Sequence, residues 1–308
     1  MQRGTSFVTS CAIIEMLANI ALDYIKNEFV KEPLKWKILS LCPEDDMLFL
    51  KNECNAASEF DPLQMRKAML DGLYNGQSHM TVATCPYGTI HAIYQTPEQY
   101  HHIPWELWGR ILRMYTEDLK PPKEGLKKGV QPFKIFFLAN DAIRRFPKGN
   151  TPITAINING GYTYHCNRET IIIYRAEDAT RVLLHELMHA CCLDRIELGV
   201  DHIEAETEAW AELLYVGFLS RGNSRQFYKL LQQQSSWIIQ QNKQVRLHMR
   251  SPMAFPWRYT IGKEEVWRRW DILHSGNKVR IGNSLRLTCA PDDMMKKMHG
   301  VSKDSTIL

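Results

Sequence analysis

The stretch RVLLHELMHA, residues 181–190, determines how the rest of the sequence is interpreted. His185 and His189 are four residues apart within it, so on a helix their rings stack on one face. Two imidazoles at that spacing can reach one zinc ion, each at about 2.0–2.1 Å. Glu186 follows the first histidine and is rotated to where it can contact a water at the metal rather than the metal itself.

The neighbours of this motif are apolar. Residues 182–184 (VLL) precede it, and residues 187–188 (LM) separate its two halves. A helix buried on most sides would make an unpaired His or Glu costly, and metal binding would relieve that cost. The alternative is a core helix whose polar residues are satisfied by neighbouring side chains.

A catalytic zinc needs a third protein ligand and an open fourth position. The pattern HExxHxxGxxH would require Gly and His where this sequence has Cys192 and Arg195, so that pattern is excluded. The segment HIEAETEAWAELL, residues 202–214, predicts a helix that carries several acids. The candidates for the third ligand are Glu208, Glu204, Glu212, His202, Asp194 and Asp201.

This arrangement resembles the gluzincins, zinc peptidases that take a glutamate from a following helix. Eighteen residues separate His189 from Glu208, and the segment from Thr207 to Glu212 (TEAWAE) is similar to their Asn-Glu-Ala-x-x-Asp segment. The resemblance covers residues 181–213. It implies that His185, His189 and Glu208 hold one Zn²⁺ per chain. It also implies that Glu212 hydrogen-bonds a zinc histidine and so fixes the orientation of that ring.

The resemblance further implies a zinc-dependent peptidase. Zinc would lower the pKa of its water toward about 7, and Glu186 would move the proton to the leaving amine. A further donor would stabilise the oxyanion. Tyr259, His248 and His274 are candidates, and we favour Tyr259 because it lies in the aromatic segment FPWRYTIG.

The residue spacing predicts an α+β fold. A mainly helical region would occupy residues 1–119 and a basic linker or loop residues 120–133. The resemblance implies a zincin-like domain at residues 134–308. That domain would hold a small mixed sheet, the active-site helix and a helical C-terminal part. The expected helices span 8–30, 61–74, 104–118, 177–192, 202–220, 223–246 and 263–273. The expected strands are a hairpin at 80–94 and strands at 134–140, 153–158 and 170–175, the last two offering a free edge to an extended peptide.

Composition sets wider limits. With 44% hydrophobic and 23% charged residues, the 308-residue chain is an ordinary globular protein. Its net charge of +4 is low for a dedicated nucleic-acid binder.

The eight cysteines form no C-x-x-C pair, so we expect mostly reduced thiols, with a disulfide left open for Cys166 and Cys289. Residues 7–24 are interrupted by Glu15 and Asp23, which favours an amphipathic helix over a signal peptide or membrane span.

We therefore expect an intracellular, cytoplasmic enzyme that acts on a peptide or protein and makes no membrane contact. Two alternatives remain open. One is an inactive zinc-binding scaffold that binds a partner, although the intact Glu186 argues against it. The other is a protease recruited to nucleoprotein through Lys127, Lys128 and Lys278.

Overall fold

A computed structural model describes residues 4–119, 131–274 and 279–290, with side chains described from residue 17 onward. Its centre is a six-stranded mixed sheet with the strand order β1-β2-β3-β4-β6-β5. The strands are β1 Lys37–Leu39, β2 His79–Cys85, β3 Gly88–Tyr94, β4 Phe133–Leu138, β5 Gly161–Tyr162 and β6 Ile171–Ile173. The pairs β3–β4 and β4–β6 are parallel, and the other neighbours are antiparallel.

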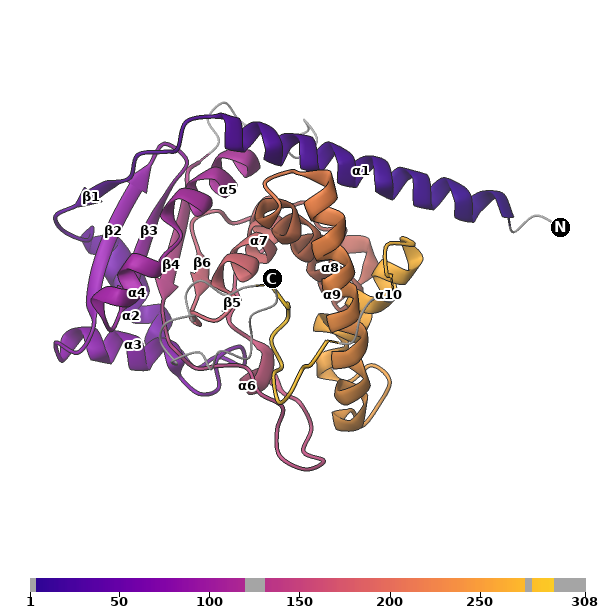
Figure 1. Ribbon diagram of the computed structural model, residues 1–308. Coiled ribbons are helices and arrows are strands. Elements are labelled where there is room, and N and C mark those ends of the chain that lie inside the picture. The colour runs from indigo at the N-terminus through magenta and orange to yellow at the C-terminus, as the bar shows by residue number, and fades with distance from the viewer. Residues whose placement is uncertain (1–3, 120–130, 275–278, 291–308) are drawn as a thin grey trace.

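Helices cover both faces of this sheet and form a separate C-terminal half. They are α1 Gly4–Val30, α2 Glu44–Asn55, α3 Met65–Tyr74, α4 Pro97–His102, α5 Trp105–Glu117, α6 Ala155–Ile158, α7 Ala179–Ala190, α8 Val200–Leu219, α9 Ser224–Val245 and α10 Ile261–Arg269. Figure 1 shows α7 lying between the sheet and the group formed by α8, α9 and α10. The long helix α1 runs along one side of the molecule and extends beyond it (Figure 1).

The alternation of side chains along β4 explains why helices lie on both faces. Ile135 and Phe137 belong to the core that includes α5 and α7, whereas Phe136 and Leu138 belong to the core under α2 and α3. All four side chains are buried. A parallel strand buried on both faces is a continuous apolar run in sequence, and residues 135–138 (IFFL) are such a run.

The sequence-based expectations are confirmed for the α+β class and for the 80–94 hairpin, which forms β2 and β3. The expected strand at 153–158 is wrong. Residues 155–158 form α6, which begins at a capping box between Thr154 and Asn157. The edge strand is instead β5, from the NGGYTY segment. The elements α2, α4 and β1 were not anticipated.

The expected boundary between a helical N-terminal region and a catalytic domain does not match this sheet. Residues 1–119 contribute β1, β2 and β3, and Ile90 of β3 is in register with Ile135 of β4. The residues on both sides of the proposed linker therefore share one sheet and its cores. Most of that linker, residues 120–130, lies outside the described residues.

Two further expectations concern cysteines and membranes. Cys166, for which a disulfide was left open, forms one with Cys192, whose thiol was expected to be reduced. Cys289 is free. The disulfide ties the turn after β5 to the residues that follow α7. Among the helices of the described residues, none combines the length and apolar character that crossing a bilayer requires.

Candidate metal centre

Helix α7 has one apolar and one polar face. Leu183, Leu184 and Leu187 are fully buried in the core against the sheet. The opposite face turns toward α8 and carries His185 and His189, one helical turn apart. Packing of the leucines therefore fixes the direction in which both imidazoles point.

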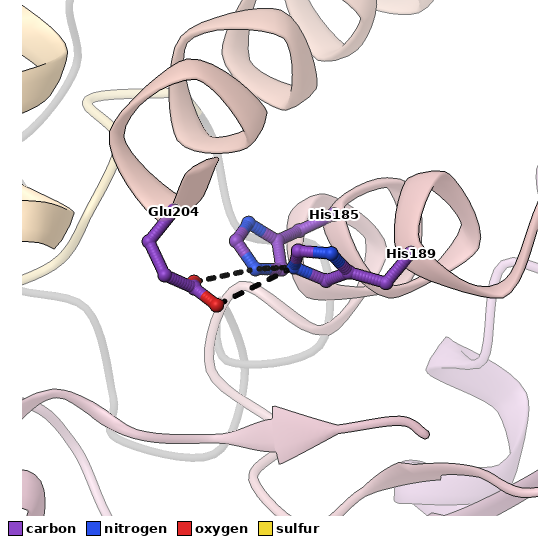
Figure 2. Close-up of side chains that lie close together, drawn as sticks. All are labelled: His185, His189 and Glu204. Carbon is purple, nitrogen blue, oxygen red and sulfur yellow. Dashed lines mark hydrogen bonds and ion pairs between the residues drawn. The ribbon is translucent and has the colours of Figure 1, made fainter. Parts of the chain in front are cut away.

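The two histidines converge on a carboxylate from the first turns of α8, which is Glu204 (Figure 2). The Nε2 atoms of His185 and His189 lie 3.1 Å apart. The Glu204 carboxylate oxygens lie 3.3 Å from Nε2 of His185 and 3.6 Å from Nε2 of His189. These three side chains form a group that could hold a metal ion.

The spacing of this group fits a tetrahedral ion. Ligand atoms at about 2.0–2.1 Å from a tetrahedral metal lie roughly 3.3 Å from one another. The separations of 3.1, 3.3 and 3.6 Å, the last two to different oxygens of the Glu204 carboxylate, bracket that value. A single cation could thus contact all three residues with only small movements of their side chains.

The other nitrogen of each imidazole faces a carboxylate. Nδ1 of His189 lies 2.8 Å from Oδ2 of Asp194, and Nδ1 of His185 lies 3.1 Å from Oε1 of Glu208. A carboxylate at Nδ1 favours a proton there and leaves the Nε2 lone pair for a metal. Asp194 was considered only as a rival ligand, so its supporting position was missed by the sequence interpretation.

The group that could hold a metal ion contains Glu204 and not Glu208, which was the expected ligand. Glu208 makes a two-pronged ion pair with the guanidinium of Arg181, a residue one turn before His185 on α7. It contacts His185 at Nδ1, not at the Nε2 atom that faces the other ligands. Fourteen residues separate His189 from Glu204, one helical turn fewer than the expected spacing.

Glu212 is likewise displaced from its expected role beside a zinc histidine. Its carboxylate accepts a hydrogen bond of 2.7 Å from the Thr288 hydroxyl and lies 3.4 Å from Arg181 and 3.7 Å from Lys263. The position expected for Glu212 is taken by Glu208. Glu204 and Glu208 thus lie where Glu208 and Glu212 were expected, one turn nearer the N-terminus of α8.

Burial shapes the electrostatics of this site. Burial alone would raise the pKa of Glu208, but Arg181 and His185 outweigh it and hold that pKa well below its usual range. Burial would lower the pKa of His185, yet Glu208 and Glu204 raise it to about 10. Nε2 of His185 therefore sits in a strongly negative environment, where a metal cation would compete with a proton.

Glu186 lines one cavity together with His185 and His189, but it is not one of the three residues that could hold a metal ion. Its side chain is buried, and burial raises its pKa to about 7 against the opposing charges of His185 and His189. A Cβ placed on Gly161 of β5 would lie 3.4 Å from its Oε1. Glu186 is therefore held between the helix and the edge strand, with a pKa suited to accepting a proton near neutral pH.

Only one of the three candidate oxyanion donors lies at this cavity. Tyr259, in the 3₁₀ helix η3 (Phe255–Tyr259), lines it. Burial, followed by the charge of Glu204, raises the pKa of Tyr259 above its usual range, so its hydroxyl stays a donor. His248 bonds the backbone oxygen of Thr151 and stacks on Phe146, and His274 is exposed.

The remaining rival ligands point elsewhere. His202 packs its ring edge against Trp257, and Asp201 pairs with Arg258 at 2.6 Å. Neither residue belongs to the group that could hold a metal.

The cavity around the metal centre has a volume of about 130 Å³. Its walls come from α7, α8, η3, β5, the segment just before β5 and the connection between β4 and α6, among other parts of the chain. They include His185, Glu186, His189, Glu204, Tyr259, Arg144, Asn159, Gly160, Gly161 and Tyr162. The strand edge and the metal centre therefore open into the same space.

Comparisons of the chain with protein-family models, with curated proteins and with solved structures found no match. The site is thus defined by its own geometry, as two histidines and a glutamate that could bind a metal ion.

Proposed function

We propose that this protein is a zinc-dependent peptidase whose metal is held by His185, His189 and Glu204. The observation that carries the proposal is the convergence of these ligand atoms within 4.8 Å of one another, with the buried Glu186 carboxylate at the same cavity. Two imidazoles and one carboxylate form a donor set that suits zinc and leaves a position open for substrate.

Each residue has a chemical task in this proposal. A zinc ion held by these ligands would lower the pKa of water at the site toward about 7 and polarise a carbonyl. Glu186 accepts the proton of the attacking water and then delivers it to the leaving amine. The Tyr259 hydroxyl donates a hydrogen bond to the oxygen that becomes negative as the water adds.

The edge of the sheet favours an extended peptide as the substrate. β5 pairs with β6 on one side and ends the strand order on the other. Gly161 of β5 approaches Glu186, so a peptide added along this strand would pass the base and the metal ligands. Backbone pairing would then position the scissile bond whatever the side chains of the substrate are.

Metal removal tests this proposal. We expect a mixed peptide library to be cleaved by the purified protein, cleavage to stop after chelation and to return when one equivalent of zinc is added. Mass spectrometry of the products measures the outcome. Zinc binding without cleavage of any peptide would instead favour an inactive scaffold.

The alternative of recruitment to nucleoprotein depends on three lysines whose structure is not described. Lys127, Lys128 and Lys278 lie outside the described residues.

A further inference from the structure

Arg144 is a buried arginine at the wall of the metal-site cavity. It lies on the connection between β4 and α6 and is 1% exposed. Its Nε donates to the backbone oxygen of Ile158 at 2.6 Å, and its Nη1 donates to the backbone oxygen of Glu177 at 2.8 Å and to the Glu177 carboxylate at 3.2 Å. These bonds lock the guanidinium plane in one orientation.

The remaining nitrogen of this guanidinium has no protein partner. Nη2 of Arg144 is buried without a hydrogen bond, whereas the residue as a whole lines the cavity. It lies against the α-carbon of Gly160, where any added Cβ would collide with it. Only a residue without a Cβ leaves room for Nη2 at this position, just before β5.

The surroundings of Nη2 favour a negatively charged acceptor. A buried donor without a partner is costly, and a hydrogen bond from a guanidinium to a carboxylate is about twice as strong as one between neutral groups. Arg175 is buried beside it, and burial together with the repulsion of Arg144 lowers the pKa of Arg175 to about 10. Burial is the first cause of this lowered pKa, and the positive charge of Arg144 adds to it.

We infer that Nη2 of Arg144 binds a carboxylate of the substrate and so selects acidic peptides. This inference rests on the proposed peptidase function and adds a substrate class to it. A peptide that runs antiparallel to β5 carries its C-terminal residues toward Gly160. The carboxylate is therefore on the leaving-group side of the scissile bond, as the side chain of an Asp or Glu or as the C-terminal carboxylate.

Binding measurements without turnover test the inference. The zinc-loaded Glu186→Gln variant is titrated with four fluorescent peptides of one sequence, which contain either Glu or Gln after the scissile bond and end in a free acid or an amide. We expect one of the two carboxylates to tighten Kd by about tenfold or more. The peptide pair that shows the effect distinguishes a side-chain carboxylate from the C-terminal one.

Two further substitutions in the same background assign the effect to Arg144. Gly160→Ala places a Cβ against Nη2, so that the guanidinium must shift away from this position. Arg144→Lys keeps a positive charge but loses the rigid, planar guanidinium. Both should reduce the preference for the carboxylate to less than twofold. Arg145→Gln, at the exposed neighbouring residue, should leave the preference unchanged.

Equal affinity for all four peptides would overturn the inference, as would an equal loss of affinity for all four in both variants. Cleavage of the peptide library by the wild-type protein is measured separately. A failure of carboxylate selection is thus distinguishable from a failure of the peptidase function.

Discussion

Replacing Glu186 with Gln should lower the rate of peptide cleavage by about 10²–10⁴-fold while zinc stays bound. Gln has nearly the same shape but cannot accept the proton of the attacking water. The metal ligands are unaffected because Glu186 is not a member of the ligand group. Cleavage kinetics and zinc content, measured on the same sample, check both halves of this expectation.

Glu197→Gln is the matched control. Glu197 is exposed on the connection between α7 and α8, so this variant should cleave at the wild-type rate. Full activity of Glu186→Gln would refute the role of Glu186 as the base. A loss of zinc in that variant would show that Glu186 also helps to hold the metal, contrary to the role given to it here.

Replacing Glu208 with Gln should destabilise the protein by about 3–5 kcal/mol, measured in chelator so that metal binding does not contribute. Arg181 and Glu208 are both nearly fully buried and form a two-pronged ion pair. Loss of the carboxylate charge leaves the guanidinium of Arg181 buried with the more distant Glu212 and Asp178 to balance it. Urea unfolding at pH 7 measures the difference in the free energy of unfolding.

The same pair predicts a pH dependence. Because the pKa of Glu208 is depressed in the folded protein, its stabilisation is fully present above the pKa of an unfolded glutamate, about 4.3. The difference in the free energy of unfolding between wild type and Glu208→Gln should therefore become smaller as the pH falls below that value. The control is Glu206→Gln, whose partner Arg195 is exposed, with an expected cost of about 0–1 kcal/mol. A similar cost in both variants would argue against a buried ion pair at Glu208.

Helix α7, which carries both histidines, could be predicted from the sequence because the residues that specify it are close together in the chain. The four-residue spacing of His185 and His189 and the leucines before and between them specify both the helix and its two faces. The third ligand depends instead on how far α8 slides along α7. Glu204, Glu208 and Glu212 share one face of α8 at equal spacing, so the sequence pattern allows each of them.

Arg181 carries the signal that could have settled this choice. The two helices run antiparallel, since Arg181 pairs with Glu208 and Glu212 whereas His189 pairs with Glu204. A buried arginine one turn before His185 needs a carboxylate of its own. Assigning Glu208 to that arginine would have left Glu204 for the histidines.

The sheet was only partly predictable for a similar reason. FKIFFL and the 80–94 hairpin are strong local strand signals. The two-residue strand β5 is too short for any periodicity, and the apolar segment ITAINI resembles a strand although its Thr154 caps a helical turn. Pairing of the N-terminal hairpin with β4 is a long-range contact that no local pattern specifies.

Anomalous X-ray diffraction from zinc-soaked crystals tests the metal centre most directly. The anomalous difference map from data collected above the zinc edge should show one strong peak per chain. The peak should be lost from the map collected below the edge. This peak should lie about 2.0–2.2 Å from Nε2 of His185, Nε2 of His189 and a carboxylate oxygen of Glu204. A peak bound by Glu208 in place of Glu204, or no peak beside the two histidines, would contradict the site described above.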